Sequence, residues 1–166
     1  MERRIGASEA DILTTQTNLA NSYSALGQLD RAVQLERDVY HASRRLLGEL
    51  HMDTLMSANN YASSLIDIWH QEEARALMRK TIPAARRVLG DNNENTLRMR
   101  KVYARALYTD DDATLDDLRE AVTTLEDIER IARRVFGGAH PLVVQFEAAL
   151  RLAQEILRAC ETLRGA

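Results

Sequence analysis

The apolar residues of this chain recur every three or four positions over most of its length, with polar residues between them. The clearest run, with steps of four, three, four and three, is Ala121, Leu125, Ile128, Ala132 and Val135. This spacing places the side chains on one face of an α-helix. The chain has two prolines and seven glycines and lacks alternating runs of Val, Ile and Thr, so strands are not expected. The pattern predicts an all-α protein.

A longer period is superimposed on the helical one. The segment from Leu47-Gly48 to Asn59-Asn60-Tyr61-Ala62 has a counterpart 42 residues to either side. A fourth copy opens at Phe136-Gly137, 47 residues after Leu89-Gly90. Such a period is typical of a solenoid, in which each helix pair buries its apolar face against its neighbours. We therefore predict a single repeat domain with antiparallel helix pairs at approximately residues 11–48, 53–90 and 95–137, and a partial, capping unit at 140–164.

The helix ends can be predicted from individual residues. Gly27 is expected to end the first helix in a left-handed conformation, and Asp53 is expected to cap the start of the third. A turn is expected near Trp69-His70. Thr114 is expected to cap a later helix. Pro83 lies within a helical pattern, where the missing backbone donor predicts a kink.

The first ten residues allow two interpretations. Ile5-Gly6 is in register with Leu47-Gly48, so residues 1–10 are interpreted as the tail of a preceding repeat. A degenerate N-terminal cap is the alternative. The first interpretation implies a longer repeat array.

Composition narrows the class of partner. The net charge of −3 argues against a nucleic-acid or membrane-surface protein, because such proteins usually carry a basic excess. No stretch approaches the roughly 20 apolar residues that a membrane helix requires. Cys160 is the only cysteine, so no disulfide is possible within the chain, and Met1 is not followed by a secretory signal. These features predict a cytoplasmic protein with no nucleic-acid or membrane partner.

No arrangement typical of catalysis is present. The four histidines lack the i, i+4 spacing of a helical metal site. His51 and His140 instead fall at matching points of the loops between repeats, which favours a structural role. The acidic run Asp110–Asp117 lacks the glycine of a calcium-binding EF-hand loop and is interpreted as a solvated loop. We expect no cofactor, no metal and no enzyme activity.

Several motifs together identify a family resemblance. The second unit carries His51-Met52-Asp53-Thr54-Leu55, Asn59-Asn60-Tyr61-Ala62, Glu72-Glu73-Ala74-Arg75 and Arg86-Arg87-Val88-Leu89-Gly90. This pattern resembles the 42-residue tetratricopeptide repeats of kinesin light chain-like proteins. The period alone also admits HEAT or armadillo repeats. Small residues in both helices of each pair favour the tetratricopeptide interpretation, namely Ala20, Ala62 and Ala104 in the first helices and Ala32, Ala74 and Ala121 in the second.

The resemblance implies a right-handed superhelix and a concave groove, lined by the first helix of each pair, that holds an extended peptide or a partner's surface. The candidate peptide-binding residues on these helices are Asn18, Asn21, Asn59, Asn60, Ser63, Arg98, Lys101 and Arg105. Asparagine amides can donate to and accept from a peptide backbone. The three basic residues follow helical spacing and would favour an acidic peptide or a free C-terminal carboxylate. The alternative is that these are ordinary polar surface residues, and that acidic residues nearby neutralise the basic ones.

Three functions remain open from the sequence. The first is a protein-interaction module with an adaptor or scaffold role. The second is a structural spacer or self-association segment of a longer array. The third is the regulatory repeat region of a larger signalling protein. The oligomeric state and the identity of a partner are not indicated.

Overall fold

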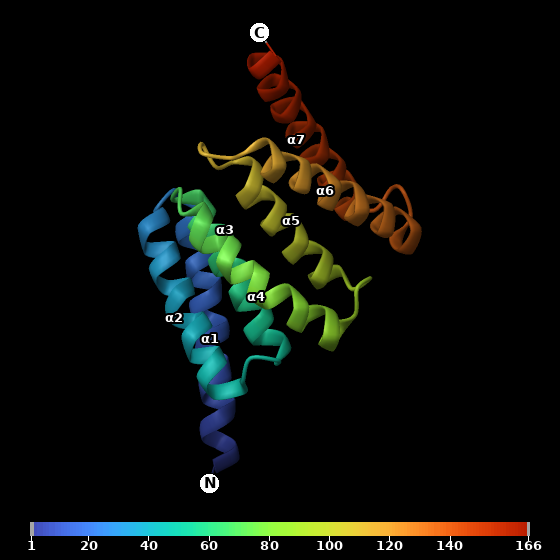
Figure 1. Ribbon diagram of the computed structural model, residues 1–166. Coiled ribbons are helices and arrows are strands. Elements are labelled where there is room, and N and C mark those ends of the chain that lie inside the picture. Colours follow the sequence, from blue (N-terminus) through green and yellow to red (C-terminus); the bar gives the residue numbers. More distant parts are fainter. Residues whose placement is uncertain (1, 166) are drawn as a thin grey trace.

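The protein is all-α. The structure, a computed structural model, describes the backbone of residues 2–165 and the side chains of residue 9 and residues 11–163. The described part forms seven helices: α1 (Glu2–Ala25), α2 (Leu29–Leu47), α3 (Met52–Asp67), α4 (Gln71–Leu89), α5 (Glu94–Tyr108), α6 (Leu115–Phe136) and α7 (Pro141–Gly165). They follow one another from α1 at one end of the molecule to α7 at the other (Figure 1).

The helices form two layers. Each helix packs against the next along the chain, so α1 with α2, α3 with α4 and α5 with α6 are antiparallel pairs. The first helices of successive pairs are also in contact, α3 with α5 and α5 with α7. Helices α3, α5 and α7 therefore lie in one layer. By the alternation of the pairs, α1 belongs to the same layer, and α2, α4 and α6 form the other. The predicted solenoid of three pairs and a final helix is confirmed.

Buried alanines hold the helices of each pair close together. The six alanines picked out by the repeat are completely buried: Ala20, Ala62 and Ala104 in the first helices and Ala32, Ala74 and Ala121 in the second. Larger side chains fill the space around them, among them Leu55, Met78, Leu97 and Leu125. The helices approach closely at the alanines, and the larger residues fill the remaining space. A bulkier side chain would therefore not fit at an alanine position.

The loops between repeats use a capping residue that the sequence analysis assigned wrongly. Asp53 was expected to cap α3, but the N-cap is His51, whose Nδ1 atom accepts from the backbone N–H of Asp53 at 3.2 Å. Asn93 does the same for α5, accepting from the N–H of Asn95 at 2.9 Å. His140 accepts from the N–H of Leu142 at 3.3 Å. His51 and His140 thus each accept a backbone hydrogen bond at the start of a helix, which confirms the expected structural role of the two loop histidines. The imidazole nitrogen does here what the amide oxygen of Asn93 does at α5.

Other predicted helix ends agree with the structure. Gly27 follows α1 with a positive φ of 72°, and α3 ends before Trp69-His70. Thr114 caps α6 in a capping box with Asp117. Helix α4 continues through Pro83, and a kink there remains a prediction.

The N-terminal helix is continuous. Helix α1 passes through Gly6, whereas Gly48 and Gly90 follow the ends of helices. Residues 2–10 therefore form no separate backbone element, and the descent of residues 1–10 from a preceding repeat remains a prediction. The side chains of Ile5 and its neighbours lie outside the described residues.

Helix α7 covers the third pair, as predicted. Leu142, Val143 and Phe146 are at most 1% exposed and pack against the core that continues from α5 and α6. Cys160 is half-buried on the same helix, next to the core. By contrast Val144 and Leu152 are 53% and 47% exposed. One face of α7 is thus buried and the other faces solvent.

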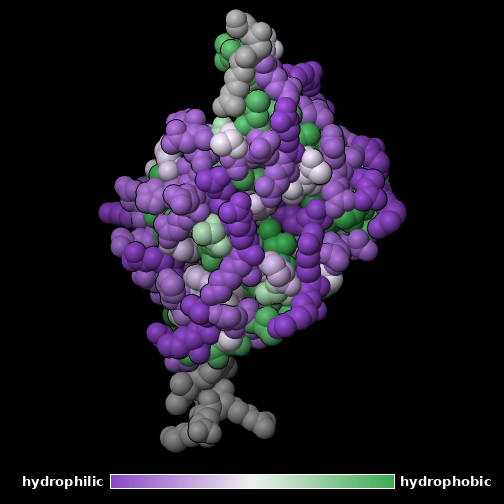
Figure 2. All heavy atoms as spheres, in the orientation of Figure 1, coloured by the Kyte–Doolittle hydropathy of each residue, from purple (hydrophilic) through white to green (hydrophobic). Residues whose placement is uncertain are grey.

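Most of the remaining surface is polar. In Figure 2 the hydrophilic residues cover most of the visible face, and apolar residues show only in small patches. No helix among the described residues is both long enough and apolar enough to cross a bilayer.

The packing of α7 leads to a prediction about stability. Phe146→Ala should lower the free energy of unfolding by about 3–5 kcal/mol, because it empties a fully buried site between α7 and the third pair. Leu152→Ala, on the exposed face of the same helix, should change it by less than about 0.5 kcal/mol. Urea unfolding followed by circular dichroism measures both. Equal effects of the two substitutions would show that α7 is not docked as described.

Candidate functional site: the groove along the first helices

The candidate residues form rows across the first helices. The 42-residue repeat places Thr14, Met56 and Arg98 in one row, Thr17, Asn59 and Lys101 in a second, and Asn21, Ser63 and Arg105 in a third. Because α1, α3 and α5 share one layer, residues of a row occupy equivalent positions on successive helices. The rows therefore run along the first helices from one repeat to the next, where the resemblance implies a groove.

The first half of the groove contains a cavity of about 220 Å³ between α1 and α3. Asn18 and Asn60 line it, together with the apolar side chains of Leu13 and Met56, and Val39 of α2 contributes to its wall. Polar amides beside an apolar floor suit a peptide, because they can bond its backbone while a side chain enters the cavity.

The other predicted amides differ in accessibility. Asn21 is exposed and Ser63 is half-buried. The Oδ1 atom of Asn59 is buried and has no hydrogen-bond partner among the described side chains. Asn18 and Asn60 line the cavity, whereas Asn59 does not.

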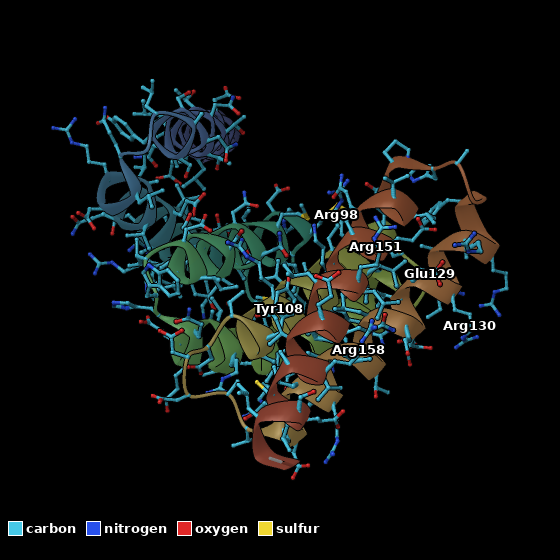
Figure 3. All side chains as sticks on the ribbon, turned by 90° about the horizontal axis from the view of Figure 1, so that it is seen from above. Arg98, Tyr108, Glu129, Arg130, Arg151 and Arg158 are labelled. Carbon is cyan, nitrogen blue, oxygen red and sulfur yellow. The ribbon has the colours of Figure 1, made fainter. Side chains whose placement is uncertain are left out.

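The three basic residues of α5 differ in whether a carboxylate already pairs with them. Arg98 donates to Glu94, four residues earlier on the same helix, at 2.7 Å. Arg105 forms an ion pair with Asp67 at the end of α3. Both guanidinium groups are thus balanced by a carboxylate, as the alternative interpretation proposed, although the acidic residues are not those of the run that begins at Asp110. Figure 3 shows Arg98 together with Arg151 and Arg158 of the neighbouring α7.

Lys101 is the exception. Its Nζ atom lies 3.5 Å from the Oε1 atom of Gln145 in α7, and no carboxylate pairs with it among the described residues. Its pKa is lowered, first by burial and then by the positive charges of Arg105 and Arg98. Both causes disfavour the ammonium form, so a bound anion would relieve them. The three basic residues are close enough to influence one another, and Lys101 carries the charge that remains uncompensated.

Comparison with known proteins settles the family. Two segments, residues 12–51 and 54–95, match the model of the tetratricopeptide repeat. The chain is a tetratricopeptide-repeat protein. Proteins with these repeats are generally protein-interaction modules, and the fold is typically non-catalytic.

Solved structures show the same fold. A kinesin light chain-like protein of Podosopora anserina with nearly identical TPR-like repeats superimposes with a TM-score of 0.77 at 24% identity, covering 87% of this chain and 66% of that one. A variant of that protein gives 0.68 at 23% identity, covering 98% and 82%. BtubC (BKLC) of P. vanneervenii gives 0.68 at 14% identity, covering 95% and 65%. A search of curated proteins gave no match.

A second cavity of this tetratricopeptide-repeat protein was not predicted from the sequence. It measures about 440 Å³ and lies where the loop after α5 approaches the turn between α3 and α4, with Trp69 on its wall. One signal was visible in the sequence, since Trp69 stands 42 residues after Gly27 at a turn where glycine is expected. The docking of the loop was not visible. No group of three potential metal ligands occurs among the described side chains.

A buried carboxyl near the groove should make stability depend on pH. Glu36 is 4% exposed, and burial raises its pKa, with the hydrogen bond of Ser64 opposing and the charge of Asp67 adding to the rise. A raised folded-state pKa gives stability that is complete below the unfolded-state pKa and is lost as the pH rises through the folded-state value. At neutral pH the charged Glu36 therefore costs stability.

We expect Glu36→Gln to be more stable than the native chain at pH 7, and the difference to disappear below pH 4.5, the ordinary value for this carboxyl. The matched control is Glu126→Gln on the exposed surface of α6, which should show no comparable change. Melting temperatures measured from pH 4 to pH 8 test this. A variant that is less stable at pH 7 would contradict it.

Proposed function

We propose that the chain binds an extended peptide or partner segment in the groove of α1, α3 and α5, with an acidic group of the ligand at Lys101. The observation that carries the proposal is the position of Lys101, which is half-buried, next to two arginines and without a carboxylate partner among the described residues. An ammonium group in that setting gains more from a ligand carboxylate than an already paired guanidinium does.

The rest of the groove supports a peptide rather than a small anion. The cavity beside Asn18 and Asn60 is separated from Lys101 by one repeat along the same layer of helices. An extended peptide could place a side chain in the cavity, meet the intervening amides with its backbone and reach Lys101 with a carboxylate. A free phosphate or acetate ion would use only the last of these contacts. The proposed role is that of an adaptor or scaffold.

Arg98 and Arg105 have a supporting part in this proposal. Their positive charges lower the pKa of Lys101, and their own carboxylates, Glu94 and Asp67, keep them from competing for the ligand. Electrostatic attraction between the ligand and this group should be reduced by salt, because the groove is open to solvent.

The chain provides a matched pair of lysines for the test. Lys80 and Lys101 are its only lysines, and Lys80 lies on α4 beside Glu49, in the other helical layer. Against an array of acidic peptides with free C-termini, Lys101→Ala should weaken binding about tenfold, equivalent to roughly 1.4 kcal/mol. Lys80→Ala should leave binding unchanged. Fluorescence anisotropy at low and moderate salt measures both.

The outcome can also refute the proposal. Equal binding of peptides in which Gln replaces Glu, with the C-terminus amidated, would show that no acidic group is read. Equal losses in the two lysine variants would show that only the overall charge matters. If no member of the array binds, the groove is not an acidic-peptide site.

A further inference from the structure

The turn between α3 and α4 holds a tryptophan in a conformation that normally belongs to glycine. At the end of α1, Gly27 has a φ of 72°, and the N–H groups of Gly27 and Gln28 donate to Ser24 and Tyr23 at 3.0 and 2.9 Å. The same two bonds recur at the end of α3, where Trp69 has a φ of 64°. It is the only non-glycine residue with positive φ among those described. A bulky side chain is disfavoured there.

Packing does not account for Trp69. Its side chain is 71% exposed, so the strained backbone is not offset by burial. Residues held in disfavoured backbone conformations cluster at active sites and ligand-binding positions. Trp69 forms one wall of the cavity of about 440 Å³ described above.

The opposite wall is the loop that interrupts the repeat. Gln71 donates through Nε2 to the carbonyl of Thr109 at 3.1 Å, and Arg75 bridges Asp110 and Asp117 at 3.1 and 3.4 Å. These contacts fix the loop after α5 against the start of α4. The third repeat is five residues longer than the 42-residue period, and this longer loop borders a cavity next to Trp69.

The cavity presents hydrogen-bond acceptors. Gln71 is only 6% exposed, and its Oε1 atom has no hydrogen-bond partner among the described residues. Glu72 and Asp112 also line the cavity, and neither forms an ion pair among the described residues. Glu73 is engaged by the hydroxyl of Tyr61 at 2.9 Å and lies 3.6 Å from His70. The charge of Arg75 is already shared by its two aspartates.

We propose that this cavity binds an arginine side chain from a basic segment of a partner protein. A planar guanidinium can stack on the indole of Trp69 while its N–H groups donate to Gln71 and to the free carboxylates. Three features agree on this occupant: an exposed aromatic face, the Oε1 atom of Gln71 without a donor among the described residues, and an excess of negative charge. The site is separate from the groove, and its ligand has the opposite charge.

The single tryptophan gives a direct readout. Titration with an acetylated, amidated peptide of alternating Gly and Arg should change the fluorescence of Trp69 in a saturable way. The matching citrulline peptide, which keeps the shape and loses the charge, should bind at least about threefold more weakly. Equal binding of the two peptides, or no saturable change with the arginine peptide, overturns the proposal.

Variants separate binding from folding. With a labelled arginine peptide followed by anisotropy, Trp69→Gly should bind at least about threefold more weakly and yet melt at a higher temperature, because glycine relieves the backbone. A tryptophan with a structural role would give a lower melting temperature instead, and that result overturns the proposal. So does unchanged binding by Trp69→Gly.

The contribution of the cavity's carboxylates can be tested with a matched control substitution. Asp112→Asn should weaken binding of the arginine peptide, whereas Asp38→Asn, an equal change of charge on the exposed surface of α2, should not. Equal effects of the two substitutions would refute a local site. Lys101→Ala should leave arginine-peptide binding intact, so failure of this site and failure of the groove are distinguished.

Discussion

Close contact between the two helices of each pair is the constraint on which the whole structure depends. It is possible because each helix of a pair has an alanine that is completely buried, as at Ala62 and Ala74. The same contact recurs in the first and third pairs, so the repeat has the same geometry each time. A regular stack of pairs then places equivalent residues of successive first helices in rows, which is what makes a groove.

The exposed face of α7 can be related to the same constraint. The register of the fourth unit, set by Gly90 and Gly137, places Arg151 at the position that Ala104 occupies in the third. Arg151 is exposed, and Figure 3 shows it projecting from α7. An exposed arginine thus stands on α7 where a completely buried alanine stands on α5. Helix α7 therefore closes the third pair with one face.

The sequence predicted the fold well because period and helical spacing are properties of the chain alone. It failed where two neighbouring residues could perform the same task. Both His51 and Asp53 can accept a backbone hydrogen bond, and residue type does not decide between them. The structure decides, because His51 is the last residue with extended backbone before α3.

The site was predicted less completely, since charge depends on neighbours that are distant in sequence. Arg98, Lys101 and Arg105 look equivalent along α5, and only the packing of α3 brings Asp67 to Arg105, 38 residues away. The cavity at Trp69 depends in the same way on Gln71 reaching Thr109. Spacing within one helix could show which side chains share a face, but not which charges would be compensated.

The positions of the carboxylates determine which charges on the first helices and on the loop after α5 are already balanced. Asp67 lies between the buried Glu36, whose pKa its charge helps to raise, and Arg105, with which it pairs. Arg105 is therefore committed to balancing charge inside the protein, whereas Lys101 has no carboxylate partner among the described residues. On the loop side, Arg75 is committed to Asp110 and Asp117, and the remaining carboxylates keep their charge. The net charge of −3 conceals this division, because each internal ion pair removes a cation and an anion from the surfaces without changing the total.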